Sequence, residues 1–312
     1  MRQTAINMVY DLAISDPRVV FIGSDLGPGV LANMKEEMPD RFFMEGVSEQ
    51  AIISMAAGMA MEGFVPYVNT IATFLTRRCY EQLAVDLCLH DLPVRLIANG
   101  GGLVYAPLGP THIAIEDIAI LRALPNMTVC AVCDADEMAR LMQASLNWPH
   151  PLYIRLAKGG DPIVSSSDAG FEIGRSILMR PPGQVLFVST GVMTNRGLEA
   201  ARLLEERGIS SGLLHVHTIK PLDVDGIRQA AKNVDLVVTL EEGIRSGGLG
   251  SAVLEEALAD NMKAAAPVMR LGLADAFPHG YGGQDHLLDL AGLQPAPIAD
   301  RVRQAVAAPV DA

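Results

Sequence analysis

The chain has 312 residues, half of them hydrophobic, and a formal net charge of −12. This length fits two domains of about 150 residues each. The acidic balance argues against nucleic acid or an anionic membrane as a partner. No stretch reaches the about 18 uncharged apolar residues of a membrane helix, and the N-terminus lacks the apolar core of a signal peptide. We therefore expect a cytoplasmic protein, and its apolar composition indicates surface hidden against other subunits.

The first half of the chain alternates apolar strands with helices. Strands are predicted at 18–26, 64–70, 93–99, 127–132 and 151–156, and helices at 48–62, 74–91, 114–124 and 134–146. Ser48 is expected to cap the helix over 48–62. The helix over 74–91 has an apolar face formed by Tyr80, Leu83, Ala84, Leu87 and Cys88. Continuous apolar strands separated by helices predict a parallel sheet covered on both faces.

A Gly-, Pro- and Ser-rich stretch at 161–183 follows and is typical of a linker with a short extended piece. The alternation then restarts. Strands are predicted at 185–190, 211–216, 234–240 and 268–273, and helices at 195–207, 223–232 and 248–259. We therefore predict an α/β protein with two doubly wound domains, 1–160 and 184–312, joined by the linker.

Four cysteines, Cys79, Cys88, Cys130 and Cys133, include a C-x-x-C in "VCAVCDADE". Such a pair can be a redox site or half of a metal site. A second C-x-x-C and a nearby His pair are missing, so buried reduced thiols are favoured. The glycines of "SGGLGSAV" (246–253) do not have dinucleotide-binding spacing, and a tight turn that lets a helix pack closely is favoured there.

Several motifs occur together in the order seen in one family. They are "FFMEGVSEQAIISMAAGMAMEG", "TIATFLTRRCYEQ", "GPTHIAIEDIAILRALPNMTV", "HTIKPLD" and "EEGIRSGGLGSAV". Over nearly its whole length the chain resembles the pyrimidine-binding and C-terminal domains of transketolases and deoxyxylulose-phosphate synthases. The resemblance implies thiamin diphosphate as cofactor and transfer of a two-carbon ketol unit between carbonyl substrates.

The resemblance also assigns roles to residues near the cofactor's pyrimidine ring. Glu49 matches the carboxyl that shares a proton with ring nitrogen N1′, and burial would strengthen that hydrogen bond. Without the resemblance, Glu49 reads as a solvated residue in a first helical turn. Phe74 matches the aromatic that stacks on the pyrimidine, although most Phe residues belong to cores. Asp25, at the end of the first strand, matches an Asp of the cofactor pocket or is a turn residue.

Two further residues match positions near the substrate. His112, in "GPTH", resembles a family histidine suited to proton transfer at the donor hydroxyl, and otherwise reads as a turn or capping residue. Arg77 resembles a substrate-end arginine of the deoxyxylulose-phosphate synthases, with a surface ion pair as the equal alternative.

The chain departs from the family pattern around the substrate. Leu108 stands where transketolases carry an Asp, and Gly29 stands where they often carry a Ser. Gly100 to Gly102 carry no side chains, whereas the matching stretch of transketolases has acidic and small residues and a histidine. A site that loses polar partners discriminates against its former substrate, so a common pentose phosphate is in doubt.

The G-D-G motif that holds the cofactor diphosphate and Mg²⁺ in the family is missing, and no residue of this chain is expected to bind metal. The resemblance therefore implies a split enzyme whose partner is an N-terminal, diphosphate-binding subunit, with an α2β2 assembly. One alternative is the β-type subunit of an enzyme that decarboxylates a 2-oxo acid. The other is a non-catalytic scaffold, which would tolerate loss of Glu49, Phe74 and His112.

Overall fold

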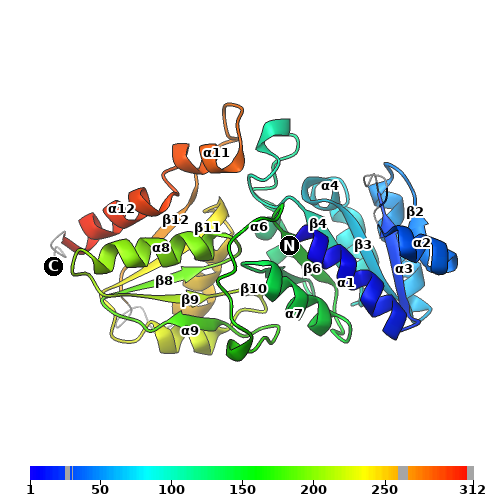
Figure 1. The fold of residues 1–312 in the computed structure, drawn as a ribbon, viewed down its shortest axis with the longest axis horizontal. Coiled ribbons are helices and arrows are strands. Elements are labelled where there is room, and N and C mark those ends of the chain that lie inside the picture. Colours follow the sequence, from blue (N-terminus) through cyan, green and yellow to red (C-terminus); the bar gives the residue numbers. More distant parts are fainter. Residues whose placement is uncertain (25–28, 30, 259–265, 308–312) are drawn as a thin grey trace.

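The computed structural model describes residues 1–24, 29, 31–258 and 266–307. Two β-sheets lie side by side, each flanked by helices, with the N-terminus near the middle of the molecule and the C-terminal helix at its outer end (Figure 1). This arrangement confirms the predicted α/β class with two sheets. Across the described residues, no helix is both long and apolar enough to cross a bilayer.

The first sheet has seven strands within the described residues. Their order is β10 (Thr218–Lys220), β5 (Thr128–Ala131), β6 (Leu152–Leu156), β4 (Arg95–Asn99), β3 (Val65–Ile71), β1 (Val19–Gly23) and β2 (Phe42–Met44). All neighbours run parallel except β10, which pairs antiparallel with β5. β10 belongs to the second half of the chain, so that half contributes an edge strand to the first sheet. Three residues are too few for a sequence pattern to reveal.

Helices cover both faces of this sheet because successive strand residues point to opposite sides. Phe21 faces helices α1 (Arg2–Ser15) and α7 (Ala135–Ser145). Its neighbour Ile22 faces the apolar side of α3 (Glu49–Met61). The shorter helices of this half are α2 (Ala32–Glu37), α4 (Ala72–Thr76), α5 (Tyr80–Gln82) and α6 (Asp117–Arg122). The sheet is therefore doubly wound, as its unbroken apolar strands predict.

The single helix predicted over 74–91 is wrong at its start. Helix α4 ends at Thr76, α5 begins at Tyr80, and Leu83–Cys88 form a π-helical turn. The Cys79 thiol donates to the Phe74 carbonyl oxygen at 3.3 Å, and a continuous helix would pair that oxygen with the amide four residues later. The predicted apolar face does point inward, because Leu83 and Leu87 are buried.

The second sheet has the order β12 (Val268–Leu273), β11 (Leu236–Ile244), β8 (Val185–Ser189), β9 (Ser211–His215) and β7 (Ile177–Arg180). β7, the short extended piece expected near the end of the linker, pairs antiparallel with β9, and the other pairs are parallel. The helices of this half are α8 (Met193–Glu205), α9 (Val224–Ala230), α10 (Leu249–Ala252), α11 (Gln284–Leu290) and α12 (Pro295–Ala307). Val253–Leu258 continue α10 as a π-helical turn.

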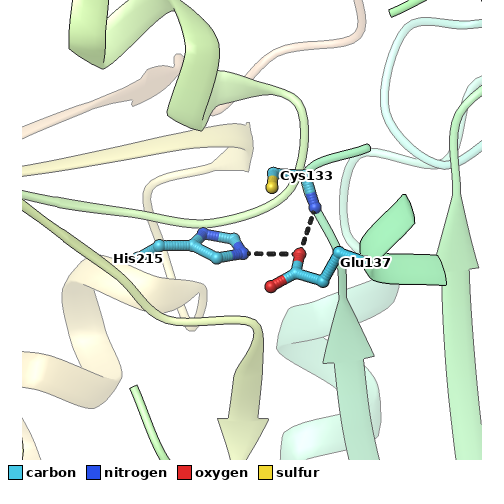
Figure 2. A group of neighbouring side chains, drawn as sticks. All are labelled: Cys133, Glu137 and His215. Atoms are coloured by element: carbon cyan, nitrogen blue, oxygen red, sulfur yellow. Dashed lines mark hydrogen bonds and ion pairs between the residues drawn. The ribbon is translucent and has the colours of Figure 1, made fainter. Parts of the chain in front are cut away.

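The two halves meet through buried polar contacts. The carboxylate of Glu137, in the first turn of α7, lies 2.9 Å from Nε2 of His215 at the end of β9 (Figure 2). Both side chains have no exposed surface. A hydrogen bond sheltered from water in this way gives the junction between the sheets a fixed geometry.

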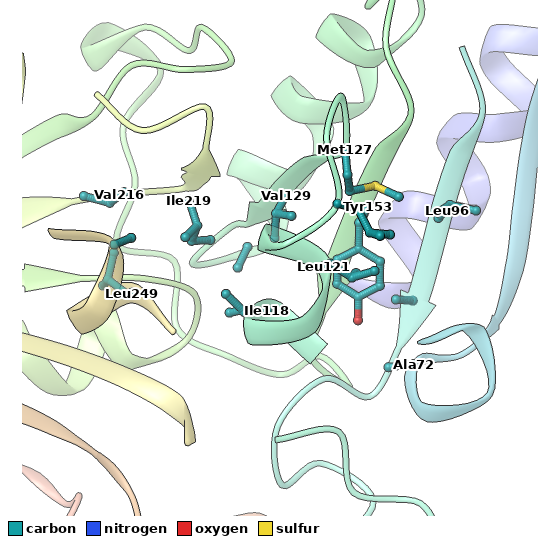
Figure 3. Close-up of a cluster of buried hydrophobic side chains, with 14 of the residues drawn as sticks. Ala72, Leu96, Ile118, Leu121, Met127, Val129, Tyr153, Val216, Ile219 and Leu249 are labelled. Atoms are coloured by element: carbon teal, nitrogen blue, oxygen red, sulfur yellow. The ribbon is translucent and has the colours of Figure 1, made fainter. Parts of the chain in front are cut away.

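An apolar core is also shared between the halves. Ile118 and Leu121 of α6 and Val129 of β5 belong to the same cluster of buried side chains as Ile219 of β10 and Leu249 of α10 (Figure 3). The cluster includes side chains from strands of both sheets, among them Leu96 of β4 and Val188 of β8. We therefore expect the two sheets to move little relative to each other, since separating them would expose this core to water.

Candidate active site

Glu49 begins helix α3, and its side chain is only 3% exposed. The hydroxyl of Ser24, which follows β1, donates to Glu49 Oε1 at 3.1 Å. Ser48 occupies the predicted cap position, but its hydroxyl donates to the Glu45 carbonyl oxygen at 2.7 Å and caps nothing. Glu49 is therefore a buried carboxyl near the positive end of a helix, not a solvated one.

Arg78 is the cationic partner of this carboxyl. Its Nη1 lies 3.1 Å from Glu49 Oε2, and its Cζ lies 4.0 Å from the centre of the Phe74 ring. The Arg78 side chain is 44% exposed, so it lies on the solvent side of the buried Glu49 carboxyl. The sequence motifs did not point to Arg78, although its position directly after Arg77 could have drawn attention to it.

Phe74 of helix α4 and His112 of the turn before α6 lie next to each other. Their ring centres are 5.3 Å apart with the planes at 62°, an edge-on arrangement. His112 Nδ1 lies 2.8 Å from the Thr111 hydroxyl oxygen. Glu49, Phe74 and His112 thus belong to one cluster, in which Arg78 connects the first two.

Arg77 contacts the segment that carries His112. Its Nη2 donates to the Ile113 carbonyl oxygen at 2.8 Å and to Glu116 Oε2 at 3.0 Å, and its Nε also contacts the Glu116 carboxylate. The Pro110 carbonyl oxygen accepts a longer bond of 3.4 Å. Arg77 therefore fixes the loop on both sides of His112, whatever else it binds.

Arg155 holds the same segment from inside the protein. Its guanidinium forms a buried ion pair with Asp117, at 2.7 Å from Nε to Oδ2, and also donates to the Ala114 and Glu242 carbonyl oxygens. Burial works against the charge, but the Asp117 carboxylate outweighs it and raises the pKa of Arg155. The pair fixes the start of α6 and links it to the second sheet. No sequence pattern pointed to this pair.

The glycine run 100–102 has a steric reason in the structure. Gly100 and Gly102 have φ of +76° and +68°, a region that side chains disfavour. A Cβ on Gly100 would lie 2.2 Å from the Tyr105 ring, and one on Gly102 would lie 2.5 Å from the Glu242 carboxyl carbon. These glycines are thus needed for close packing. Leu108 is 54% exposed.

Two consecutive buried glutamates brace this region from the second half of the chain. Glu242 accepts from the Leu103 amide at 2.9 Å and from Gln284 at 2.8 Å. Glu241 accepts from the Leu249 and Gly250 amides at the start of α10. Burial raises the pKa of Glu241 to about 7 despite these two hydrogen bonds. Gly247 and Gly248 lie in the bend before α10, and a Cβ on Gly248 would lie 1.9 Å from the Glu241 carboxylate, so a glycine there permits close packing.

The remaining candidate, Asp25, lies outside the described residues. Gly29 is exposed and has a φ of +82°. The structure thus brings Glu49, Phe74 and His112 together and places Arg77 beside them through its contacts with the His112 loop. This arrangement offers a buried carboxyl, a half-buried aromatic ring and an imidazole at one place, which suits the binding of a flat heterocycle and proton transfer beside it.

Comparison with protein-family models gives two matches. Residues 1–160 match the model described as transketolase, pyrimidine binding domain, and residues 174–298 match transketolase, C-terminal domain. A 1-deoxy-D-xylulose-5-phosphate synthase of Synechococcus sp. is 38% identical over 297 residues, covering 94% of this chain and 45% of that protein. The transketolase family protein y4mN of Sinorhizobium fredii is 38% identical over 296 residues, covering 94% and 85%. The chain thus spans less than half of the synthase.

Two solved structures share the fold. A split gene transketolase, described as an inactive beta4 tetramer, superposes with a TM-score of 0.89 at 33% identity over 97% of both chains. A transketolase mutant from Pichia stipitis superposes with a TM-score of 0.79 at 19% identity, over 98% of this chain and 45% of that one. The second likeness shows the fold alone.

Proposed function

Since the chain belongs to the transketolase family, we propose that it is the pyrimidine-binding and C-terminal subunit of a split enzyme that transfers a two-carbon ketol unit. The similarity to a split gene transketolase, which covers 97% of both chains, supports a division at this point. The synthase relatives are about twice as long as the stretch they share with this chain. The partner would be a chain with the diphosphate-binding domain, and we propose an α2β2 assembly.

The transketolase relatives imply thiamin diphosphate as cofactor. The residues present fit its pyrimidine half, because Glu49 offers a carboxyl that is 3% exposed and Phe74 offers a ring beside it. When bound, the cofactor supplies a carbon nucleophile that can attack a carbonyl group. We place the ligands of its diphosphate and of Mg²⁺ on the partner subunit, where hard oxygen ligands are required.

The single observation that carries the proposal is the buried carboxyl of Glu49. A carboxyl shielded from water can form a strong hydrogen bond to a ring nitrogen placed beside it. Ser24 Oγ lies 3.1 Å from Glu49 Oε1 and 2.5 Å from the Gly46 carbonyl oxygen, and these two oxygens share its single proton. Glu49 Oε2 faces Arg78.

Arg78 holds the place of that partner in this structure. Its planar guanidinium contacts Glu49 Oε2 and lies over the Phe74 ring, the same two contacts that an aminopyrimidine would need. The side chain is 44% exposed and has room to swing outward into solvent. We therefore propose that Arg78 neutralises Glu49 until cofactor binding displaces it.

His112 and Arg77 complete the proposed site. The His112 imidazole, edge-on to Phe74 at 5.3 Å, would transfer a proton at the donor hydroxyl of the substrate. Arg77 would position this histidine through the Ile113 carbonyl and Glu116. Because Leu108 and the glycines at 100–102 offer no side-chain hydrogen bonds, we expect a carbonyl substrate with fewer hydroxyl contacts than a pentose phosphate.

Exposed apolar side chains near Glu49 support a subunit that covers the pocket. Met44 and Val47, just before helix α3, are 41% and 68% exposed. They lie on the chain segment that leads to Glu49, which is the edge a diphosphate-binding partner would close. Exclusion of water there would strengthen the proton sharing at Glu49.

Reconstitution tests the proposal. The full chain is mixed with a candidate partner that carries the diphosphate-binding domain, thiamin diphosphate and Mg²⁺, and is assayed with a ketose donor and an aldehyde acceptor. We expect ketol transfer without CO₂ release from the pair and no turnover from either chain alone. Robust turnover by this chain alone contradicts the split arrangement. CO₂ release from a 2-oxo acid with no ketose transfer contradicts the reaction type.

A further inference from the structure

A second cluster of reactive side chains lies apart from Glu49, on the opposite face of the first sheet. Cys133, Glu137 and His215 each present a ligand atom, and these atoms lie within 4.8 Å of one another. Among the described residues this is the group of His, Cys and acidic side chains whose geometry suits a metal ion. Figure 2 shows the Cys133 sulfur beside the facing His215 ring and Glu137 carboxylate.

Three rigid elements position these atoms. Cys133 lies just beyond β5, Glu137 is in the first turn of α7, and His215 ends β9 of the other sheet. Asp134 caps α7 by accepting from the Glu137 amide at 2.9 Å, which fixes the spacing between Cys133 and Glu137. Ligands on such elements keep their geometry without a bound ion, as a selective site requires.

One oxygen of the cluster has no partner. Glu137 Oε2 accepts from the Cys133 amide at 2.7 Å and lies 2.9 Å from His215 Nε2. Glu137 Oε1 is fully buried and forms no hydrogen bond. A buried carboxylate oxygen without a partner is unfavourable by about 1–3 kcal/mol or more. The local protein groups therefore leave one acceptor free for something else.

The imidazole is oriented as a metal ligand would be. His215 Nδ1 lies 2.7 Å from the Thr194 hydroxyl, which in turn lies 2.9 Å from the Ser189 hydroxyl. In metal sites a hydrogen bond at one ring nitrogen fixes the ring and directs the other nitrogen at the ion. His215 has this arrangement, with Nε2 directed at Glu137.

We propose that Cys133, Glu137 and His215 form a buried site for a divalent transition metal of the zinc class, which joins the two sheets. Thiolate, carboxylate and imidazole are the ligand types that zinc takes. A thiolate and a carboxylate balance a charge of +2, so the occupied site is neutral inside the protein. On binding, the Cys133 sulfur releases its proton to solvent and bonds the ion. Glu137 exchanges the His215 hydrogen bond for the ion. His215 gives up its Nε2 proton to solvent and takes one at Nδ1, where it faces the Thr194 hydroxyl, so that the neutral imidazole binds through Nε2.

The proposed site is not the C-x-x-C pair that the sequence offered as a possible redox or metal site. Cys130 is buried but contacts Thr218, and it is not part of the cluster. His215 is 78 residues from Glu137, so no local spacing could reveal the third ligand. Because the ligands come from both halves of the chain, an ion here would act as a clamp between them.

Cobalt is the probe that tests the site. The full chain is unfolded with chelator and refolded with Co²⁺, because the site is too buried for ready entry into the native protein. We expect one Co²⁺ per chain and a near-ultraviolet thiolate-to-cobalt charge-transfer band that added Zn²⁺ removes. The Cys133→Ser variant should lose the band. Cys130→Ser, the matched control, should keep it.

The outcome does not depend on the variants folding. Refolded wild-type protein that holds less than stoichiometric Co²⁺, or holds it with no thiolate band, overturns the proposal, since surface binding through histidines would produce that result. A band that survives in folded Cys133→Ser also overturns it. In support, Zn²⁺ should raise the thermal unfolding midpoint of the wild type and leave that of His215→Asn unchanged, with circular dichroism to confirm that the variant folds.

Discussion

Two buried glutamates, Glu49 and Glu137, lie in the first turns of helices that cover opposite faces of the same sheet, and their surroundings differ. Glu49 pairs with Arg78, whose side chain is 44% exposed and can leave. Glu137 pairs with the fully buried His215 of the other sheet. Burial raises the Glu137 pKa, but His215 and the Cys133 amide outweigh it and lower that pKa to about 2. A glutamate in a first helical turn thus has a partner that reaches solvent on one face of the sheet and a fully buried partner on the other.

The largest expected effect is on turnover, and it tests the role that this comparison gives to Glu49. In the reconstituted enzyme, Glu49→Gln should lower kcat/KM by about 10²–10⁴-fold, the range for loss of an essential proton-transfer group. Glu62→Gln, an exposed acid beyond the other end of the same helix, is the matched control and should leave the rate unchanged. Steady-state kinetics would decide, and wild-type turnover by Glu49→Gln would show that another carboxyl does the work.

Asp117 is another acid with a buried partner, Arg155. Asp117→Ala leaves the buried Arg155 guanidinium uncompensated and should lower the free energy of unfolding by about 3–5 kcal/mol. Asp300→Ala removes an ion pair of similar length, Arg207 to Asp300 at 2.6 Å, but half of the Asp300 side chain is exposed. That control should change stability by less than about 1 kcal/mol. Urea unfolding measures both, and equal losses would contradict the assignment by burial.

Glu241 allows a test by pH. Its pKa is raised, so its effect on stability changes with pH in the opposite direction from that of Glu137, whose pKa is lowered. The pKa of Glu241 in the folded protein, about 7, lies above the ordinary glutamate value of 4.5. Between pH 4.5 and pH 7 the folded state therefore binds more protons than the unfolded state. The contribution of Glu241 to the free energy of unfolding should be largest below pH 4.5. It should fall by about 3 kcal/mol as the pH rises to 7. The difference in unfolding free energy between wild type and Glu241→Gln should follow this course. A pH-independent difference, such as we expect for exposed Glu255→Gln, would refute it.

The smallest expected effect concerns Arg78. The Arg78→Ala variant removes the cation that pairs with the buried Glu49 carboxyl. If Arg78 must leave before the cofactor binds, the variant should bind thiamin diphosphate up to about 5-fold more tightly in the assembled enzyme. Calorimetric titration measures this, with the exposed Arg202→Ala as control. Weaker binding by Arg78→Ala would mean that Arg78 helps to hold the cofactor.

The sequence predicted the α/β class and most strands because period and composition are local properties. It failed where a distant contact decides the outcome. The helix over 74–91 breaks where the Cys79 thiol bonds the Phe74 carbonyl oxygen. β10 was invisible because its partner, β5, lies about 90 residues earlier in the chain.

The site residues divide in the same way. Glu49, Phe74 and His112 were found because each belongs to a motif that resembles a known family, and the structure places them together. Arg78, Arg155 and Glu242 belong to no such motif. Their importance depends on which carbonyl or carboxylate they meet, and that is settled only when the chain is folded.

By itself, the sequence determined the two α/β units, the family resemblance and the residues around Glu49, because hydrophobic period and motif order are written along the chain. Only the tertiary structure decided the rest. It buried Glu49 beneath Arg78, gave the first sheet a strand from the second half, and joined Cys133 and Glu137 to His215. The physical reason is that burial and pairing depend on atoms far apart in sequence, which meet only when the apolar faces of both sheets pack together.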